Sequence, residues 1–201
     1  MEYSTLSDEK LMLKYGDGDA NAFNVLYGRH KDPMYRYVVR QVKDLDLAND
    51  LYQDLWGRII RASTSYKTSA KWTTWAYRIA HNLVIDHYRT LKPVDPEVEA
   101  ASSETPSSLH EQNELSQQLM HCMGKLPAVQ REVFLLTQET DLTLSMIADV
   151  IDASHEAVKS RLRYAKSALK ECLARFDVVP SSAGQPSTAM SSSCANSRRR
   201  T

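Results

Sequence analysis

The sequence has no long apolar run and few cysteines. A membrane-spanning helix needs about 20 consecutive apolar residues, and no stretch of this 201-residue chain approaches that length. The N-terminal MEYSTLSDEK contains neither the basic nor the apolar region of a secretory signal. Cys122, Cys172 and Cys194 lie far apart and form no C-x-x-C. These absences predict a cytoplasmic protein with reduced thiols and no membrane insertion.

The sequence also lacks the motifs of common catalytic and phosphate-binding sites. It contains no G-x-x-x-x-G-K-S/T, no H-E-x-x-H and no nucleophile elbow. His121, Cys122 and Cys172 do not have the spacing of metal ligands. We therefore expect no enzyme, no cofactor and no metal site. The 25 basic and 25 acidic residues give a formal net charge of zero, but a zero total can hide local charge and does not exclude nucleic acid.

Apolar residues recur at spacings of three and four through most of the chain, and few stretches suit strands. The sequence predicts an all-α protein with two small helical domains, at residues 1–91 and 115–176. Residues 92–114 between them are rich in Pro, Ser and Glu and predict a flexible acidic linker, because they bury too little apolar surface to offset their ordering entropy. The Ser-rich residues 177–201 predict a disordered tail.

The most informative stretch is residues 142–173, LTLSMIADVIDASHEAVKSRLRYAKSALKECL. A short apolar helix with Thr143 as its cap precedes a turn, and Ser154 can cap a longer second helix. Basic and polar side chains line the outer face of that second helix. The pattern indicates a helix-turn-helix, whose second helix enters the DNA major groove. The alternative is an ordinary helical hairpin with a solvated charged face.

Residues 71–89, KWTTWAYRIAHNLVIDHYR, form a second informative stretch. Their apolar stripe includes Trp72 and Trp75, which we expect to lie mainly in the core. The outer face combines an aromatic, cations and an amide, which suits single-stranded nucleic acid because bases stack on aromatics and phosphates meet arginine. A merely hydrated polar face is the alternative. The side chains expected on this exposed face are Tyr77, Arg78, His81, Asn82 and Arg89.

Residues 46–62 form a third amphipathic helix, with Leu47, Leu51, Leu55 and Ile59 repeating every four positions. Its opposite side carries acidic and amide groups. These groups suit either an ordinary solvated surface or a docking face for a basic partner. The candidate docking residues are Asp50, Gln53 and Asp54. Upstream, Pro33 interrupts a helical pattern and predicts a kink or a break.

Together, these motifs resemble a bacterial sigma factor of the extracytoplasmic-function (ECF) group, over roughly residues 6–176. The stretch AFNVLYGRHKDPMYRYVVRQVKDLDLANDLYQDLW is similar to the family's core-binding part, and WAYRIAHNLVIDHYR is similar to the part that contacts the promoter −10 element. LPAVQREVFLL and IADVIDASHEAVKSRLRYAKSAL resemble the domain that contacts the −35 element. Several such motifs in the family's order are far more specific than a helix-turn-helix alone.

The resemblance implies partners and a role for each site. The partners are core RNA polymerase (the clamp and flap), promoter DNA and an anti-sigma factor. Asp50, Gln53 and Asp54 would dock on the clamp of the largest polymerase subunit. The loop at 66–71 and the helix start at Trp72 would capture a base flipped from the −10 strand. The melted −10 strand would meet Trp75, Tyr77, Arg78, His81, Asn82 and Arg89, and the −35 duplex would meet Ser154, His155, Glu156, Lys159, Ser160, Arg161 and Arg163.

The sequence departs from the family's pattern at a few positions. Asp152 stands where the family usually has a glycine in the turn, and Asp tolerates the left-handed conformation better than most residues. Ala157 replaces a usual threonine and His81 a common arginine. These changes bear on the promoter sequence and not on the fold. A self-sufficient, dimeric helix-turn-helix regulator is the alternative function, but it leaves the exposed face at residues 77–82 without a purpose.

Overall fold

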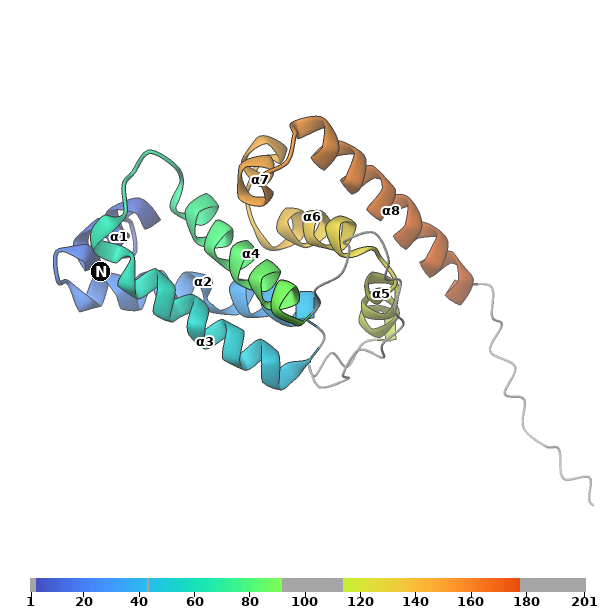
Figure 1. Ribbon diagram of the computed structural model, residues 1–201, viewed down its shortest axis with the longest axis horizontal. Coiled ribbons are helices and arrows are strands. Elements are labelled where there is room, and N and C mark those ends of the chain that lie inside the picture. Colours follow the sequence, from blue (N-terminus) through green and yellow to red (C-terminus); the bar gives the residue numbers. More distant parts are fainter. Residues whose placement is uncertain (1–2, 43, 92–113, 178–201) are drawn as a thin grey trace, which may run out of the picture.

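The computed structural model describes residues 3–42, 44–91 and 114–177 (Figure 1). These residues form eight α-helices and one short 3-10 helix, and no strand occurs among them. The predicted all-α fold is therefore confirmed. The predicted linker and tail lie outside the described residues, except that Glu114 opens one helix and Asp177 closes another.

The first four α-helices pack together as an N-terminal unit. Side-chain caps start two of them, because Ser7 Oγ accepts a hydrogen bond from the Lys10 amide at 3.4 Å and Asp44 Oδ1 accepts one from the Leu47 amide at 2.9 Å. Helix α2 contacts α1, α3 and α4, so it is the centre of the unit. The elements are α1 (Asp8–Gly16), α2 (Ala20–Val42), α3 (Leu45–Arg61), the 3-10 helix η1 (Ser63–Ser65) and α4 (Trp72–Leu91).

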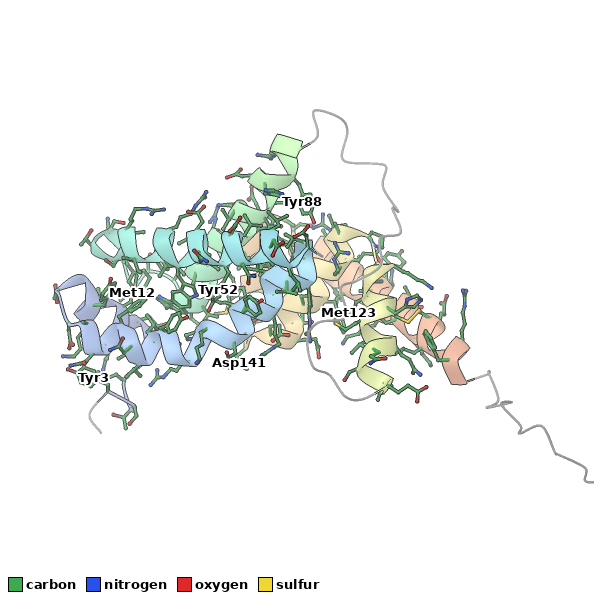
Figure 2. All side chains as sticks on the ribbon, turned by 90° about the horizontal axis from the view of Figure 1, so that it is seen from below. Tyr3, Met12, Tyr52, Tyr88, Met123 and Asp141 are labelled. Atoms are coloured by element: carbon green, nitrogen blue, oxygen red, sulfur yellow. A yellow bond between two sulfur atoms is a disulfide. The ribbon has the colours of Figure 1, made fainter. Side chains whose placement is uncertain are left out.

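Aromatic side chains occupy much of the space between these helices. Tyr37 of α2 and Trp72 of α4 are fully buried. Tyr52 of α3 lies edge-on to Tyr35 of α2, with ring centroids 5.2 Å apart (Figure 2). Such pairs add about 0.5–1.5 kcal/mol to the gain from burial alone. The Tyr35–Tyr52 pair helps to fix how α3 lies against α2.

Helix α2 runs through Pro33 without a break. The proline removes one backbone hydrogen bond and costs about 3 kcal/mol in a helix interior. Met34, Tyr37 and Val38 lie in the next turn and a half of the helix and are all fully buried. Because each large apolar side chain gains about 1.5–3 kcal/mol on burial, their packing outweighs the cost of the proline.

The last four α-helices form a C-terminal unit in which α8 contacts each of the others. Its core contains Leu135, Leu136, Ile147 and Val158, all fully buried. The apolar stripe of α8 recurs at spacings of three and four, is buried or half-buried, and holds the unit together; it consists of Val158, Leu162, Ala165, Leu169 and Leu173. The elements are α5 (Glu114–Gly124), α6 (Ala128–Glu139), α7 (Leu144–Ile151) and α8 (His155–Asp177).

Both helices of the α7–α8 pair start with the side-chain caps that the sequence predicts. Thr143 Oγ1 accepts from the Met146 amide at 3.3 Å, and Ser154 Oγ accepts from the Ala157 amide at 3.2 Å. Asp152 adopts the left-handed conformation, with φ 51° and ψ 52°. The sharp reversal therefore uses aspartate where glycine is the easier residue.

A disulfide joins Cys122 of α5 to Cys172 of α8, with Cα atoms 5.8 Å apart. The prediction of reduced thiols is therefore wrong for this pair. Both cysteines lie on the inner faces of helices that pack together, whereas 50 positions separate them in the sequence. Spacing along the chain could not reveal that proximity. Cys194 lies outside the described residues.

The two units contact each other. Helix α2 packs against α6, and α4 packs against α7. Figure 1 shows α4 next to α7. Hydrogen bonds and ion pairs cross the contact between residues about 100 positions apart in sequence. The structure is thus a closed arrangement of the N-terminal and C-terminal units, which the sequence-based picture of two tethered domains did not include.

Candidate nucleic-acid interface

Helix α4 begins where its backbone meets a carboxylate of α1. The Trp72 amide donates to Glu9 Oε1 at 3.0 Å, which supplies the cap that α4 lacks in its own sequence. Inside the helix, the predicted apolar stripe is largely confirmed. Its buried members are Trp72, Ala76, Ala80, Leu83 and Val84, while Trp75, Ile79 and His87 are half-buried.

Three of the predicted contact residues on α4 are exposed, as expected: Arg78, Asn82 and Arg89. They combine an amide with two cations on the outer side of the helix. Trp75 is half-buried and packs edge-on against Tyr66, with ring centroids 5.0 Å apart. Trp75 therefore connects α4 to the loop at 66–71, where Tyr66 also donates to the Ala70 carbonyl at 3.3 Å.

Tyr77 is not on the exposed face of α4, so that expectation is wrong. Its side chain is 1 % exposed and packs edge-on against Tyr37, with centroids 5.3 Å apart. Burial, reinforced by the nearby charge of Glu139, raises the pKa of Tyr77. Its hydroxyl has no hydrogen-bond partner among the described residues. The periodicity of α4 could not show this burial, because the surroundings of Tyr77 come from α2 and α6.

His81 lies at the contact between the two units, half-buried and not exposed as predicted. Its Nδ1 is 2.6 Å from Oε1 of Glu132, and the same oxygen accepts a hydrogen bond from the Tyr37 hydroxyl at 2.7 Å. Only 14 % of the His81 side chain is exposed. In this closed arrangement α6 therefore covers the side of α4 that carries Tyr77 and His81.

The predicted duplex-contacting residues lie around the N-terminal half of α8. Ser154, His155, Glu156, Lys159 and Arg163 are exposed, whereas Ser160 and Arg161 are half-buried. Lys159 Nζ lies 3.7 Å from Glu156 Oε1, and both side chains are well exposed. Such a pair adds little to stability, so the Lys159 ammonium can contact another anion.

Sequence reasoning missed Tyr164, which is 55 % exposed on the same helix. The Arg163 guanidinium lies over its ring, 5.0 Å from the centroid. This contact holds Arg163 against the helix and shapes the cationic surface of α8. A tyrosine outside the apolar stripe of α8 was the available signal.

The predicted docking residues lie on the outer side of α3. Asp50 and Gln53 are exposed, and Asp54 is 42 % exposed in its side chain. Asp54 pairs with Arg58 at 3.0 Å and with Arg61 at 3.4 Å on its own helix. These exposed pairs are weak, so a basic partner can compete for the carboxylate.

Neither a membrane-spanning helix nor a metal site is found in the part of the chain that the structure describes. No helix there is long and apolar enough to cross a bilayer. No group of three or more His, Cys, Asp or Glu side chains in these ranges could hold a metal ion.

Comparison with known families assigns both units. Residues 26–93 match the family model of Sigma-70 region 2, and residues 116–169 match that of Sigma-70, region 4. Together the two matches cover more than half of the chain. The chain belongs to the sigma-70 family. Its curated relatives place it in the ECF group, as an RNA polymerase sigma factor.

Two of these relatives align with this chain over most of its length and over nearly all of their own. The ECF RNA polymerase sigma factor SigW of Bacillus subtilis is 29 % identical over 179 residues, which are 82 % of this chain and 96 % of SigW. The ECF RNA polymerase sigma factor SigK of a Mycobacterium species (strain KMS) is 25 % identical over 181 residues, 86 % of this chain and 94 % of SigK. The suggested self-sufficient dimeric regulator receives no support, because both units match sigma regions.

Two solved structures share the fold of this sigma factor. CnrH in complex with the cytosolic domain of CnrY has a TM-score of 0.63 and 23 % identity, and covers 84 % of this chain and 97 % of CnrH. The sigma factor RpoE in complex with the anti-sigma factor NepR from Bartonella quintana has a TM-score of 0.60 and 20 % identity, over 76 % of this chain and 96 % of RpoE.

Proposed function

We propose that this sigma factor docks on core RNA polymerase through α3 and contacts promoter DNA through α4 and α8, in the cytoplasm and without catalysing a chemical step. The observation that carries the proposal is the pair of polar helix faces, one on each unit. One face is on α4, in the residues that match region 2, and the other is on α8, in the residues that match region 4.

Docking is assigned to the outer side of α3. Asp50, Gln53 and Asp54 contact basic side chains on the clamp of the largest polymerase subunit. Their exposure supports this role, and so does the weakness of the pairs that Asp54 makes within α3. Charge complementarity of this kind mainly speeds and orients association.

Contact with the melted −10 strand is assigned to α4 and the loop before it. The exposed Arg78, Asn82 and Arg89 suit the strand as they stand, because arginine neutralises phosphate and an amide hydrogen-bonds a base edge. Tyr77 and His81 join them when the C-terminal unit moves away, and Trp75 contributes from its place beside Tyr66. The loop at 66–71 and the start of α4 hold a base flipped out of the stack, which costs a few kcal/mol that the pocket must offset.

Contact with the −35 duplex is assigned to α8. The second helix of a helix-turn-helix meets base edges with its N-terminal residues and phosphates with its flanks. The residues assigned to this duplex are Ser154, His155, Glu156, Lys159, Ser160, Arg161 and Arg163. Five of the seven are exposed, which supports the assignment.

The two contacts act together on the polymerase. When one promoter contact has formed, the second element is held near its binding helix at a high effective concentration. Two weak contacts therefore become one selective interaction. Since α4 gains energy only from unstacked bases, it favours open over closed promoter DNA. We assign residues 1–91 to core binding and the −10 element, and residues 115–176 to the −35 element.

We also propose an anti-sigma partner that covers the docking helix α3 or the recognition helix α8. Support comes from the solved relative RpoE, which was crystallised with an anti-sigma factor. An anti-sigma factor bound there would block core polymerase or duplex DNA.

In vitro transcription tests the proposed function most directly. Purified core polymerase is given a library of genomic fragments with and without this protein, and transcript start sites are mapped. We expect a discrete set of new start sites that appears only with the protein. Identical transcripts in both reactions, together with no association with core polymerase on a native gel, would refute the proposal.

A further inference from the structure

The loop at residues 66–71 is exposed between two buried aromatic side chains. Tyr66 is 6 % exposed and Trp72 is fully buried, whereas all five residues between them are exposed. The Tyr66 ring packs edge-on against Trp75, and its hydroxyl donates to the Ala70 carbonyl across the loop. The loop is therefore accessible to a partner along its length, and its shape depends on how Tyr66 and Trp72 are held.

Helix α1 contacts the elements at both ends of this loop, η1 before it and α4 after it (Figure 1). At the first end, α1 and η1 approach so closely that a Cβ atom on Gly16 would lie 3.1 Å from the Ser63 carbonyl oxygen. At the second end, Glu9 Oε1 accepts a hydrogen bond from the Trp72 amide at 3.0 Å. Because these contacts flank the loop, α1 fixes the separation between its two ends.

The Trp72 amide needs this partner, because the first N–H groups of an α-helix find none within the helix. Lys71, the residue before it, has no side-chain oxygen that could cap α4. Burial alone would raise the pKa of Glu9, but the hydrogen bond from the Trp72 amide lowers that pKa below its usual range. The Glu9 carboxylate is therefore charged at neutral pH, and its charge suits the positive N-terminal end of α4.

A second carboxylate of α1 acts on the side chain of Trp72. Asp8 Oδ2 lies 2.7 Å from His30 Nε2, and the His30 ring packs against the Trp72 ring with centroids 4.4 Å apart. Asp8 also pairs with Arg29 at 2.7 Å. Glu9 thus holds the backbone of Trp72, and Asp8 holds its indole through His30. Two adjacent residues of α1 therefore fix one end of the loop.

We propose that Glu9 is a positioning residue for the capture of the base flipped from the −10 strand. Its carboxylate holds the start of α4, and with it the loop at 66–71, in the shape that receives the base, without touching DNA itself. A loop that is already ordered binds more tightly, because its ordering entropy is not lost on binding. This inference rests on the proposed function and extends the −10 contact to a support on α1.

Hydrogen exchange followed by mass spectrometry measures the order of the loop in the full-length protein alone. Glu9→Ala removes the acceptor, whereas Glu9→Gln loses the charge but keeps an acceptor oxygen. Amides of the loop and of the first turn of α4 should exchange about fivefold faster in Glu9→Ala, the usual effect of losing a helix cap. Glu9→Gln should exchange like the wild type, and so should Asp17→Ala, an exposed change at the other end of α1. Unchanged exchange in α8 excludes general unfolding.

Binding of single-stranded promoter DNA measures base capture. Polymerase that contains this sigma factor is titrated with the fluorescein-labelled non-template strand of one promoter found by start-site mapping, and with derivatives that each lack one base of the −10 element. Glu9→Ala should bind the intact strand about fivefold more weakly than the wild type. On the strand that lacks the captured base the two proteins should bind equally, because the loop has no base to hold. This coupling is what a double-mutant cycle between protein and DNA detects.

The pattern across the strands decides the proposal. A loss in Glu9→Ala that persists on every strand, or no loss on the intact strand, would refute the positioning role. An equal loss in Glu9→Gln would overturn the role of the hydrogen bond. A transcription assay without new start sites would refute the proposed function and the base capture with it. Hydrogen exchange uses neither polymerase nor promoter, so it would still show whether Glu9 holds the loop.

Discussion

Arg36 and Glu139 lie 103 positions apart in the sequence, yet Arg36 Nε donates to Glu139 Oε2 at 2.9 Å. The carboxylate is almost fully buried, whereas the arginine is 40 % exposed. Removing one partner of a buried pair costs about 3–5 kcal/mol, and the exposure of Arg36 places this pair at the lower end or below. Arg40 shares the same carboxylate, so Glu139 pairs with two cations of the N-terminal unit.

Asn82→Ala should impair promoter opening and spare binding to core polymerase. Asn82 is exposed on α4, so its removal leaves the packing of the helix intact. One amide contact to a base is worth about 1–3 kcal/mol, which predicts about a tenfold or greater loss of open complex. Permanganate reactivity of unpaired thymines measures opening, and a native gel measures core binding. Equal loss in both assays would point to misfolding and reject the specific role.

Tyr77→Phe should keep or raise the stability of the protein. The hydroxyl is buried without a hydrogen-bond partner among the described residues, and an unsatisfied buried polar group costs about 1–3 kcal/mol. The ring itself packs on Tyr37, so Tyr77→Ala should lose about 3–5 kcal/mol. Urea denaturation measures both changes. A clear loss of stability in Tyr77→Phe would mean that the hydroxyl is hydrogen-bonded in solution.

Local patterns predicted the helices and their caps well. The spacing around Trp72 and Leu83 gave the buried stripe of α4, and Thr143 and Ser154 cap the helices as expected. These features depend on residues within a few positions of one another. Propensity, capping and periodicity are all local effects, so a single sequence contains them.

Contacts between distant segments were not predictable in the same way. The periodicity of α4 placed Tyr77 and His81 outside the apolar stripe. It contains no information about the side chains of α2 and α6 that cover these two residues in the folded protein. The Cys122–Cys172 pair was missed for the same reason. The site residues that remained exposed, such as Asn82 and Lys159, are those with no partner unit against them.

Reducing the Cys122–Cys172 disulfide should destabilise the C-terminal unit. The bond closes a loop of about 50 residues, for which the chain-entropy estimate is about 4 kcal/mol. We expect thermal unfolding to begin roughly 10 °C lower in reductant than in its absence. Cys122→Ser/Cys172→Ser should unfold early in both conditions, and Cys194→Ser should behave like the wild type. No effect of reductant on the wild type would show that the disulfide adds nothing to stability.

Lys159→Ala should weaken binding to duplex DNA and lower its salt dependence. Lys159 is 63 % exposed near the start of α8, and its contact with Glu156 is too long and too exposed to hold it. If it meets one phosphate, its loss reduces the slope of log affinity against log salt by about 0.9 for a duplex. The measurement is a salt titration of promoter binding by the polymerase that contains this sigma factor. Lys170→Ala, an exposed lysine farther along α8, is the matched control and should keep the wild-type slope. A slope unchanged by Lys159→Ala would exclude a phosphate contact and would leave the surface of α8 around Arg163 as the remaining cationic contact.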